Sequence, residues 1–360
     1  MLFAVAAPGL EPVVLAELRA LGVAARAQAG GVLVEDDAQL ERVNLWLRTA
    51  SRVLVRAGEL KATAFPELVR KAAALPWERF VRRGAKVAFH VTCRKSRLYH
   101  SGGVRERLHA ALEQRLGFAA PLAGPDDESA QLFVARFDHD VCTISADSSG
   151  TLLHQRGWRG PQAKAPLRET LAAALLLAAG YGGELPLCDP LCGSGTIAIE
   201  AALIAMRRAP GLERQFAFQS WPGYEAKKFE ELRAHARLLQ QPLRAPIEAS
   251  DQDAGAVAAA RENVARADVP VTIVQRQLSQ LPPDAGTGLL VCNPPYGVRV
   301  AAGDIARQLA AVLRLRPAWQ LAAVVAEGAA FQRAGIRTEQ LLRTQNGGIR
   351  VEMIKGQVQP

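Results

Sequence analysis

The chain alternates between short apolar stretches and amphipathic stretches, and this pattern changes near residue 150. Residues 1–50 predict a strand, a helix, a strand and a helix, in the segments LFAVAA, PVVLAELRALG, GVLVED and LERVNLWLRTA. The next unit carries strands RVLVRAGEL and KVAFHVTC, helices near 65–75 and 103–116, and the strands AQLFVARF and VCTISAD. A short turn at 138–140 predicts that the last two strands form a hairpin. Mixed short strands and helices indicate a small α+β module.

The second half shows the alternation of an α/β fold. Strand-like runs LPLCDP, PIEASD, VTIV, GLLVCNPP and WQLAAVVA are interspersed with predicted helices at 169–179, 196–206, 254–266 and 305–315. The charged residues 207–246 have no such period and are expected to be irregular. The segments QLLRTQ and IRVEMIKG flank Asn346-Gly347, which tolerates positive φ and predicts a terminal hairpin. We therefore expect a doubly wound sheet with one reversed strand.

Composition places the chain among soluble globular proteins, with 49% hydrophobic and 22% charged residues. No apolar run approaches the roughly 20 residues of a membrane span, and the N-terminus lacks the basic region of a signal peptide. The five cysteines are scattered, and Cys188 and Cys192 have no second pair or histidine nearby. We expect reduced thiols, no metal site and a cytoplasmic location, and nothing in the sequence demands an oligomer.

The net charge of +9 is concentrated in the first half. Residues 1–165 hold 23 Lys and Arg against 17 Asp and Glu, whereas the remainder holds 21 against 18. This bias suggests a polyanionic partner that touches the N-terminal half, although a general preference for arginine would give a similar excess. The segment 151–165, TLLHQRGWRGPQAKA, reads either as a linker that touches phosphate or as a solvated linker.

A glycine-rich turn, Asp189-Pro-Leu-Cys-Gly-Ser-Gly-Thr196, follows a predicted strand and opens a helix. Glycine lets the backbone pass close beneath a ligand there. The turn also fits a dinucleotide fingerprint, but no acidic residue ends a strand about 20 positions later, and no Walker lysine follows. A carboxylate at Asp189 would repel phosphate and suits a cationic group, such as the methionine ammonium of S-adenosylmethionine.

The next predicted strand of the sheet ends at Asp251, in Ala-Ser-Asp-Gln-Asp. A carboxylate at a strand end can accept both ribose hydroxyl protons of a bound nucleoside. Asp251 could instead cap the following helix, but Asp253 is better placed for that role. We therefore predict that Asp251 binds the ribose.

The motif Asn293-Pro294-Pro295-Tyr296 follows the apolar strand 288–292. A base amino group is a poor nucleophile because its lone pair is delocalised into the ring. The Asn293 side-chain oxygen and the Pro294 carbonyl could accept its two N–H groups, and proline rigidity would hold that carbonyl in place. Tyr296 could stack on an extruded base. A surface turn would also use Asn and Pro, but not two prolines and an aromatic after a buried strand.

Taken with these motifs, the chain resembles the THUMP-containing bacterial RNA guanine-N2 methyltransferases, especially the N-terminal half of the 23S rRNA enzyme. The matching segments are PGLEPVVLAEL, NLWLRTASRVLVR, RLYHSGGVRERL, LHQRGWR, APLRETLAAALLLAAGY, DPLCGSGTIAIEAA, RRAPGLERQFAFQSW and NPPYGVR. The resemblance implies a ferredoxin-like domain at 1–52, a THUMP RNA-binding domain at 53–147, a linker at 148–165 and a class I methyltransferase domain at 166–360.

The resemblance also implies functional residues. The catalytic motif is Asn293, Pro294, Pro295 and Tyr296. The residues expected to hold S-adenosylmethionine are Asp189, Pro190, Cys192, Gly193, Ser194, Gly195, Thr196, Asp251, Gln277, Leu278 and Asn293. The segment Arg168-Glu169-Thr170 would close over the methionine end of the cofactor, or would simply start a helix. Gln277 stands where the family usually has an Asp, so its contact to adenine would carry no charge.

We expect RNA, either 23S rRNA or tRNA, to contact basic residues of the N-terminal half and the linker: Arg94, Lys95, Arg97, Arg105, Arg107, Arg156 and Arg159. DNA adenine-N6 and protein glutamine methylation use the same Asn-Pro-Pro-Tyr chemistry and remain alternatives. The basic α+β module that precedes the catalytic domain favours RNA. A non-enzymatic RNA-binding protein is less favoured because both catalytic motifs are intact.

Overall fold

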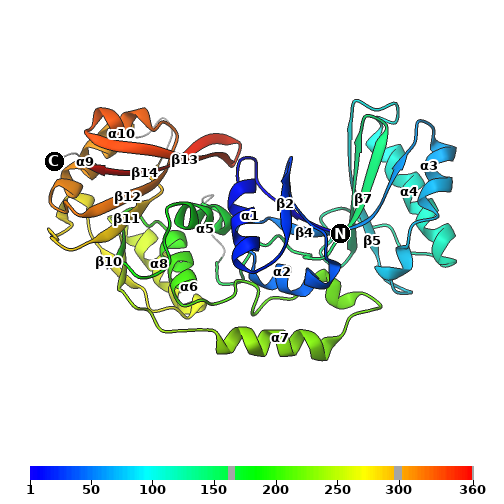
Figure 1. The fold of residues 1–360 in the computed structure, drawn as a ribbon, viewed down its shortest axis with the longest axis horizontal. Coiled ribbons are helices and arrows are strands. Elements are labelled where there is room, and N and C mark those ends of the chain that lie inside the picture. The colour runs from blue at the N-terminus through cyan, green and yellow to red at the C-terminus, as the bar shows by residue number, and fades with distance from the viewer. Residues whose placement is uncertain (161–166, 296–301, 359–360) are drawn as a thin grey trace.

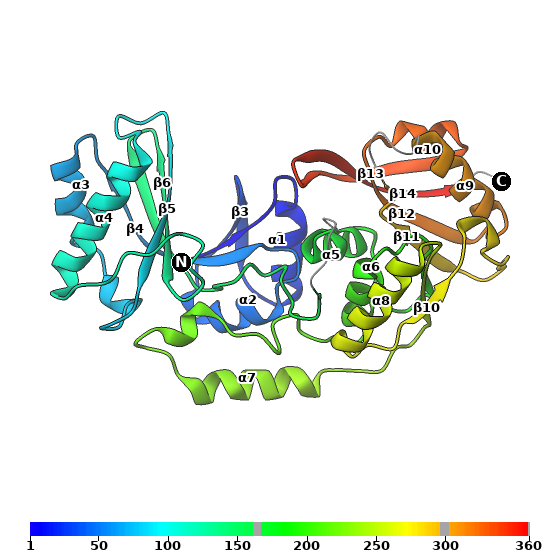
Figure 2. The same ribbon diagram turned by 180° about the vertical axis from the view of Figure 1, so that it is seen from behind.

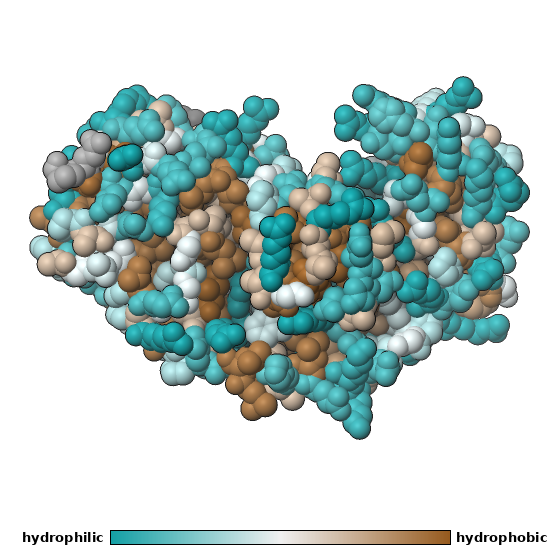
Figure 3. Space-filling model, in the orientation of Figure 1, coloured by the Kyte–Doolittle hydropathy of each residue, from teal (hydrophilic) through white to brown (hydrophobic). Residues whose placement is uncertain are grey.

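The computed structural model describes residues 1–160, 167–295 and 302–358. This part of the chain forms two seven-stranded sheets that lie at opposite ends of an elongated molecule (Figure 1). A notch separates the end that carries α3 and α4 from the rest, and apolar side chains gather where α1 meets α5 (Figure 3).

The first sheet is continuous across the two predicted N-terminal units. Its strands are β1 Leu2–Val5, β2 Ala25–Gln28, β3 Gly31–Val34, β4 Arg52–Lys61, β5 Val87–Arg94, β6 Gln131–Asp138 and β7 Val141–Asp147. The order is β2-β3-β1-β4-β7-β6-β5, and only β5 and β6 run parallel. Strand β4 pairs with β1 on one side and β7 on the other, so the expected boundary at residue 52 falls at its start.

Helices cover this sheet along its length. They are α1 Glu11–Ala20, α2 Leu40–Trp46, α3 Phe65–Ala72 and α4 Ser101–Leu116, with short 3₁₀ turns at Asp37–Gln39 and Trp77–Arg79. Under α3 and α4, the rings of Trp77, Phe80, Phe89 and Phe133 pack edge to face or stacked. Such contacts add to the burial of apolar area. The hairpin predicted around 138–140 is confirmed as β6 and β7.

The second sheet has the predicted doubly wound form. Its strands are β8 Leu187–Asp189, β9 Ile247–Asp251, β10 Thr272–Gln275, β11 Gly288–Cys292, β12 Trp319–Val325, β13 Ile336–Asn346 and β14 Ile349–Val358. The order is β10-β9-β8-β11-β12-β14-β13, in which β14 runs antiparallel between β12 and β13. The prediction of a class I methyltransferase sheet with a reversed terminal strand is confirmed.

Helices lie on both faces of this sheet. They are α5 Glu169–Ala178, α6 Thr196–Ala205, α8 Ala254–Ala267, α9 Ala302–Arg314 and α10 Ala329–Arg333. Helix α7 Ala226–Leu238 lies away from this sheet (Figure 1), and 3₁₀ turns are found at Ala217–Ser220 and Leu278–Gln280. Leu289 and Val291 of β11 pack in the core under α5, α6 and α8, whereas Leu290 and Cys292 pack in the core under α9 and α10. Burial on both faces explains why the central strand is continuously apolar.

Three details differ from the sequence prediction. Strand β2 was not expected, because its residues ARAQ have no apolar alternation. The stretch predicted to be irregular contains helix α7, which buries only Phe229, Arg233 and Ala236 and runs along the outside of α2 (Figures 1 and 2). The terminal hairpin turns at Gly347 and Gly348, whose φ angles are positive, one residue beyond the expected pair.

Candidate active site

The predicted site residues meet at the carboxyl edge of the second sheet. Strands β8, β9 and β11 are parallel neighbours, so their carboxyl ends point to the same edge. Asp189 is the last residue of β8, Asp251 is the last residue of β9, and Asn293 follows β11. In open α/β sheets ligands bind beyond this edge, at the point where the strand order reverses. Here the order reverses between β8 and β11.

The glycine turn crosses this edge between β8 and α6. Gly193 and Gly195 have φ angles of +52° and +84°, which L side chains rarely adopt. A Cβ on Gly195 would lie 3.4 Å from the Ala260 Cβ, whereas one on Gly193 would meet open space. The second glycine therefore allows close packing against α8, and the first leaves the outer face of the turn free for a ligand.

Asn263 of α8 makes a hydrogen bond that anchors the glycine turn. The sequence analysis did not predict this role. Its Nδ2 donates to the Ser194 carbonyl at 3.0 Å, and its Oδ1 accepts from the Gly160 N–H at 3.1 Å. The side chain is buried, and its position on the apolar side of a helix was the available signal. Asn263 thus joins the glycine turn to the end of the segment that precedes the catalytic domain.

Asp251 also makes a hydrogen bond to the glycine turn. Its Oδ2 accepts from the Gly193 N–H at 3.0 Å, and its Oδ1 accepts from the Asp253 N–H at 3.0 Å. The cap of α8 is Asp253, whose Oδ1 accepts from the Ala256 N–H at 2.7 Å. Asp253 is therefore the cap of α8, as expected, and the ribose role of Asp251 stays a prediction.

Asp189 is the most deeply buried acid at this edge, at 1% exposed. Burial, together with the neighbouring charge of Asp251, raises the pKa of its carboxyl to about 8. The hydrogen bond that Asp189 accepts from the Leu191 N–H at 3.3 Å lowers this pKa and so partly offsets the effect of burial. The carboxyl group is therefore protonated at neutral pH until a cation lies beside it.

Asn293 presents an unsatisfied acceptor. Its Oδ1 is buried and has no hydrogen-bond partner among the described residues, as is also true of the Ser194 hydroxyl on the glycine turn. Buried acceptors without partners are uncommon in folded proteins, and each one calls for an explanation. Pro294 is buried and Pro295 is exposed, while Tyr296 lies outside the described residues.

The remaining predicted cofactor residues lie close to this edge. Gln277 directly precedes the 3₁₀ turn Leu278–Gln280, and its side chain is exposed. Leu278 is buried in the core beneath α9. Pro190 and Cys192 are buried in the glycine turn. Thr196 opens α6, and its hydroxyl accepts from Arg159 at 2.9 Å.

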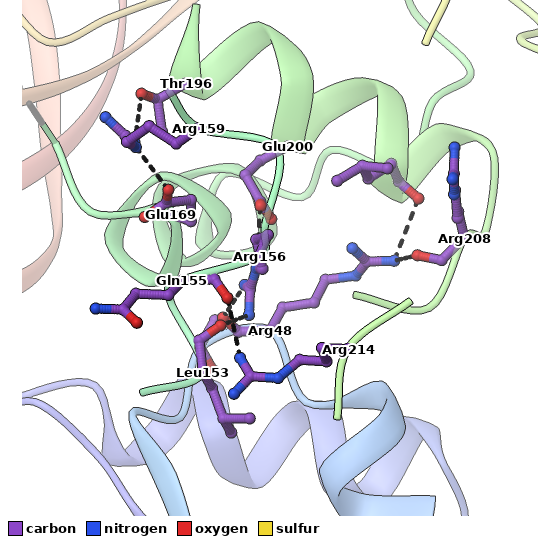
Figure 4. A network of polar contacts seen from close by, with 12 residues as sticks. Arg48, Leu153, Gln155, Arg156, Arg159, Glu169, Thr196, Glu200, Arg208 and Arg214 are labelled. Carbon is purple, nitrogen blue, oxygen red and sulfur yellow. Dashed lines mark hydrogen bonds and ion pairs between the residues drawn. The ribbon is translucent and has the colours of Figure 1, made fainter. Parts of the chain in front are cut away.

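Arg156 was predicted to contact RNA, and this prediction is wrong. Its side chain is 2% exposed, with Nε 3.2 Å from the Glu200 carboxylate in α6. Its other nitrogens donate to the carbonyls of Leu153 and Arg48 (Figure 4). Glu200 was missed in the sequence, and the available signal was its place as the single charged residue of an otherwise apolar helix. The pair joins the first sheet's unit to the catalytic unit.

Arg159 is also used inside the protein. Its Nε donates to the Glu169 carboxylate at 2.7 Å, and its Nη2 donates to the Thr196 hydroxyl (Figure 4). Burial raises the pKa of Glu169, and Arg159 opposes that effect. The side chain retains only 19% exposure, so it packs beside the glycine turn instead of facing solvent.

The other predicted RNA contacts lie on the surface of the first sheet's unit. Arg94, Lys95 and Arg97 are exposed at the end of β5 and in the loop after it. Arg107 is exposed above the Phe65 ring, and Arg105 is half-buried. Tyr99 stands in the same loop at 79% exposed and was not singled out in the sequence. An exposed aromatic among arginines is a common feature of surfaces that stack bases.

Within the described ranges, no cluster of three or more His, Cys, Asp or Glu side chains could hold a metal ion. No helix among the same residues is long and apolar enough to cross a membrane.

Comparison with known proteins identifies the family of this chain. The family model described as "RMKL-like, methyltransferase domain" matches residues 156–316, and the "RlmL ferredoxin-like domain" matches residues 1–54. "Putative RNA methyltransferase slr0064" of Synechocystis is 34% identical, over 98% of this chain and 95% of that protein. "Ribosomal RNA large subunit methyltransferase K/L" of Syntrophotalea carbinolica is 36% identical over 98% of this chain, which spans 53% of that relative's length.

Solved structures agree with this assignment. A Listeria monocytogenes protein described as a "predicted N6-adenine-specific DNA methylase" matches with a TM-score of 0.88 and 31% identity, over 98% of this chain and 95% of that one. "SMU.472, a putative methyltransferase complexed with SAH" matches with a TM-score of 0.87 and 29% identity, over 100% and 98%. The chain therefore belongs to the RlmL-like family of S-adenosylmethionine-dependent class I methyltransferases.

Proposed function

We propose that this protein transfers a methyl group from S-adenosylmethionine to an exocyclic base amine in RNA, and that the target is guanine N2 in 23S rRNA. The observation that carries the proposal is the buried Oδ1 of Asn293, just after β11, which has no hydrogen-bond partner in the part of the chain that the structure describes. An amine with two N–H groups is the substrate that such an acceptor fits.

The carboxyl edge fits the cofactor by its donor set. Asp189 would hold the methionine ammonium, because a buried carboxyl with a raised pKa gains most from a neighbouring cation. Asp251 would accept the ribose hydroxyls, and the open face of Gly193 leaves room for the nucleoside above the turn. When bound, S-adenosylmethionine supplies an electrophilic methyl group.

The residues after β11 would prepare the nucleophile. Asn293 Oδ1 and the Pro294 carbonyl each accept one N–H of the base amine, which turns the nitrogen lone pair out of the ring plane. Because Pro294 is buried and has a fixed φ, its carbonyl is held in place before the substrate arrives. Preorganised acceptors of this kind stabilise the positive charge that develops on nitrogen. The methylated amine then releases one proton to solvent.

RNA is favoured as the substrate by the first half of the chain. The exposed Arg94, Lys95, Arg97 and Tyr99 cluster at one end of β5. Phosphate contacts and stacking explain this combination better than a protein substrate does. Relatives that carry both units are named as RNA or ribosomal RNA methyltransferases. A cytoplasmic monomer acting on 23S rRNA is the form we propose.

Three other substrates are alternatives to 23S rRNA. Transfer RNA would use the same amine and the same exposed arginines. DNA adenine-N6 is suggested by the description of the Listeria structure, and protein glutamine carries a similar amide nitrogen. Neither of the last two explains why a basic α+β unit precedes the catalytic sheet.

Radiolabelled methyl transfer to total tRNA and rRNA tests the proposal. The RNA should come from a strain that lacks the gene, and the labelled nucleosides should be identified. N2-methylguanosine in 23S rRNA is the expected product, and the same product in tRNA would change only the substrate RNA. Label on DNA or protein with none on RNA would contradict the proposal.

A further inference from the structure

A cavity lies between the catalytic sheet and the N-terminal unit. It has a volume of about 420 Å³. Its walls include the Pro8-Gly9 turn after β1, Ala326 at the end of β12, and residues 343–345 and 350–352 of the β13–β14 hairpin. The hairpin reaches from the catalytic sheet toward α1 (Figure 1).

On one side of the cavity, the backbones of the two units approach closely at Gly9. A Cβ on Gly9 would lie 1.9 Å from the Arg343 carbonyl oxygen, and Gly9 has a φ of +84°. No other residue allows this approach without moving the backbone. The hairpin and the turn after β1 are therefore held against each other, and the cavity has walls from both.

The cavity opens at the same sheet edge as the catalytic motif. Cys292 is level with Ala323 in β12, and Val325 of β12 is level with Glu352 in β14. Two strand spacings, or about 10 Å, separate β11 from β14, which carries Arg350, and three, or about 15 Å, separate it from β13, which carries Thr344. The cavity therefore lies close enough to Asn293 along the sheet edge to meet a phosphate of the same RNA strand.

The side chains of the cavity suit a phosphate group. Thr344 is only 5% exposed, and its hydroxyl is buried without a hydrogen-bond partner. Arg350 is exposed, and no ion pair is found for it among the described residues. Arginine presents N–H groups in a fork that matches phosphate oxygens.

One carboxylate lies in the same cavity but is already engaged. Glu352 Oε1 accepts from Arg343 Nε at 3.2 Å, and Oε2 accepts from the Gly328 N–H at 3.1 Å. Arg343 keeps its remaining N–H groups for a ligand. The two arginines and one glutamate leave a net positive charge.

We propose that this cavity binds a backbone phosphate of the RNA strand, next to the base presented to Asn293. The inference rests on the proposed function and extends it by assigning Arg350 and Thr344 as contacts that position the target nucleotide. Because the cavity is built by both units, it sets the position of the strand relative to the catalytic edge.

Equilibrium binding of 23S rRNA transcript and of total tRNA, measured over a range of salt concentrations, tests this assignment. Arg350→Gln should weaken RNA binding about tenfold and reduce the salt slope by roughly one phosphate contact. Thr344→Val should weaken binding severalfold without changing the slope, and Thr344→Ser should restore it. Affinity for S-adenosylhomocysteine should stay unchanged in all three variants.

Arg337→Gln is the matched control, because Arg337 is an exposed arginine near the other end of β13. Wild-type-like RNA affinity and salt slope in Arg350→Gln, together with wild-type affinity in Thr344→Val, would overturn the assignment. If inorganic phosphate binds the wild type, and Arg350→Gln abolishes that binding while RNA affinity is unchanged, the cavity is a free-anion site and the assignment also fails. Failure of the wild type to methylate any RNA would instead refute the proposed function.

Discussion

Two regions of the molecule bury polar groups, and they do so in opposite ways. At the junction between the units, Arg156 is paired with Glu200, and Arg159 is paired with Glu169. At the carboxyl edge of the second sheet, the Asn293 oxygen has no partner, and Asp189 has a strongly raised pKa. A buried group that is paired within the protein stabilises the fold, whereas one left unpaired is available to a ligand.

The largest expected effect is at the junction. Arg156→Met removes one member of a fully buried pair and leaves the Glu200 carboxylate without its cation. We expect the free energy of unfolding to fall by about 3–5 kcal/mol. Urea denaturation monitored by circular dichroism measures this change.

Two further variants define what the junction contributes. Arg333→Met breaks the exposed Arg333–Glu327 pair and should change stability by less than about 1 kcal/mol. The double variant Arg156→Met with Glu200→Met should recover much of the lost stability, since no unpaired charge remains. If Arg156→Met is as stable as the wild type, the junction pair has no structural role.

At the sheet edge, Asp251→Ala should act on ligand binding more than on the fold. The expected loss of S-adenosylhomocysteine affinity is about 10-fold to 100-fold, as for a hydrogen bond to a charged group. Isothermal titration calorimetry measures it directly. Asp253→Ala is the matched control, because it removes the cap of α8, costs about 1 kcal/mol of stability and should leave the affinity unchanged.

The raised pKa of Asp189 predicts a pH dependence of cofactor binding. The free protein holds a proton on this carboxyl below about pH 8, and a bound ammonium group favours its loss. Binding therefore releases a proton below that pH, so affinity should rise as pH increases, by at most tenfold per pH unit, and level off above pH 8. Titrations between about pH 6 and pH 8 check this. An identical dependence in Asp189→Asn would assign it to another group.

The smallest effect concerns arginines that are neither buried nor paired. Replacing Arg94 and Arg97 with Gln should leave stability unchanged, since both side chains are exposed. RNA affinity should fall severalfold, and the salt dependence of binding should decrease by the amount that corresponds to about two phosphate contacts. Filter binding at several salt concentrations measures both quantities. An unchanged slope would show that these side chains do not touch RNA.

The sequence predicted those parts of the molecule that are specified by a few consecutive residues. The glycine turn and Asn293-Pro294 each follow an uninterrupted apolar strand, and Asp253 is a standard helix cap. The partners of buried arginines are not local, since Glu200 lies 44 residues beyond Arg156 in the chain. An arginine in a linker therefore looked the same whether it faced RNA or a carboxylate.

The pairing of strands that are distant in the chain could not be predicted from the sequence either. Strand β4 joins β1 to β7, so one sheet continues across a boundary that the sequence placed at residue 52. Helix α7 was missed because a helix that stands outside the core needs few apolar residues. The cavity beside Gly9 also depends on a contact between residues more than 300 positions apart.

The most direct test of the account is Asn293→Ala assayed for both binding and methyl transfer. The variant should fold normally, because Asn293 Oδ1 makes no hydrogen bond within the described part of the chain, and it should bind RNA with near wild-type affinity, because the phosphate contacts remain. Methyl transfer in a single turnover should fall by about a hundredfold or more, as expected when a preorganised contact to developing charge is removed. Transfer at the wild-type rate in this variant would contradict the assignment of Asn293 as the acceptor for the amine.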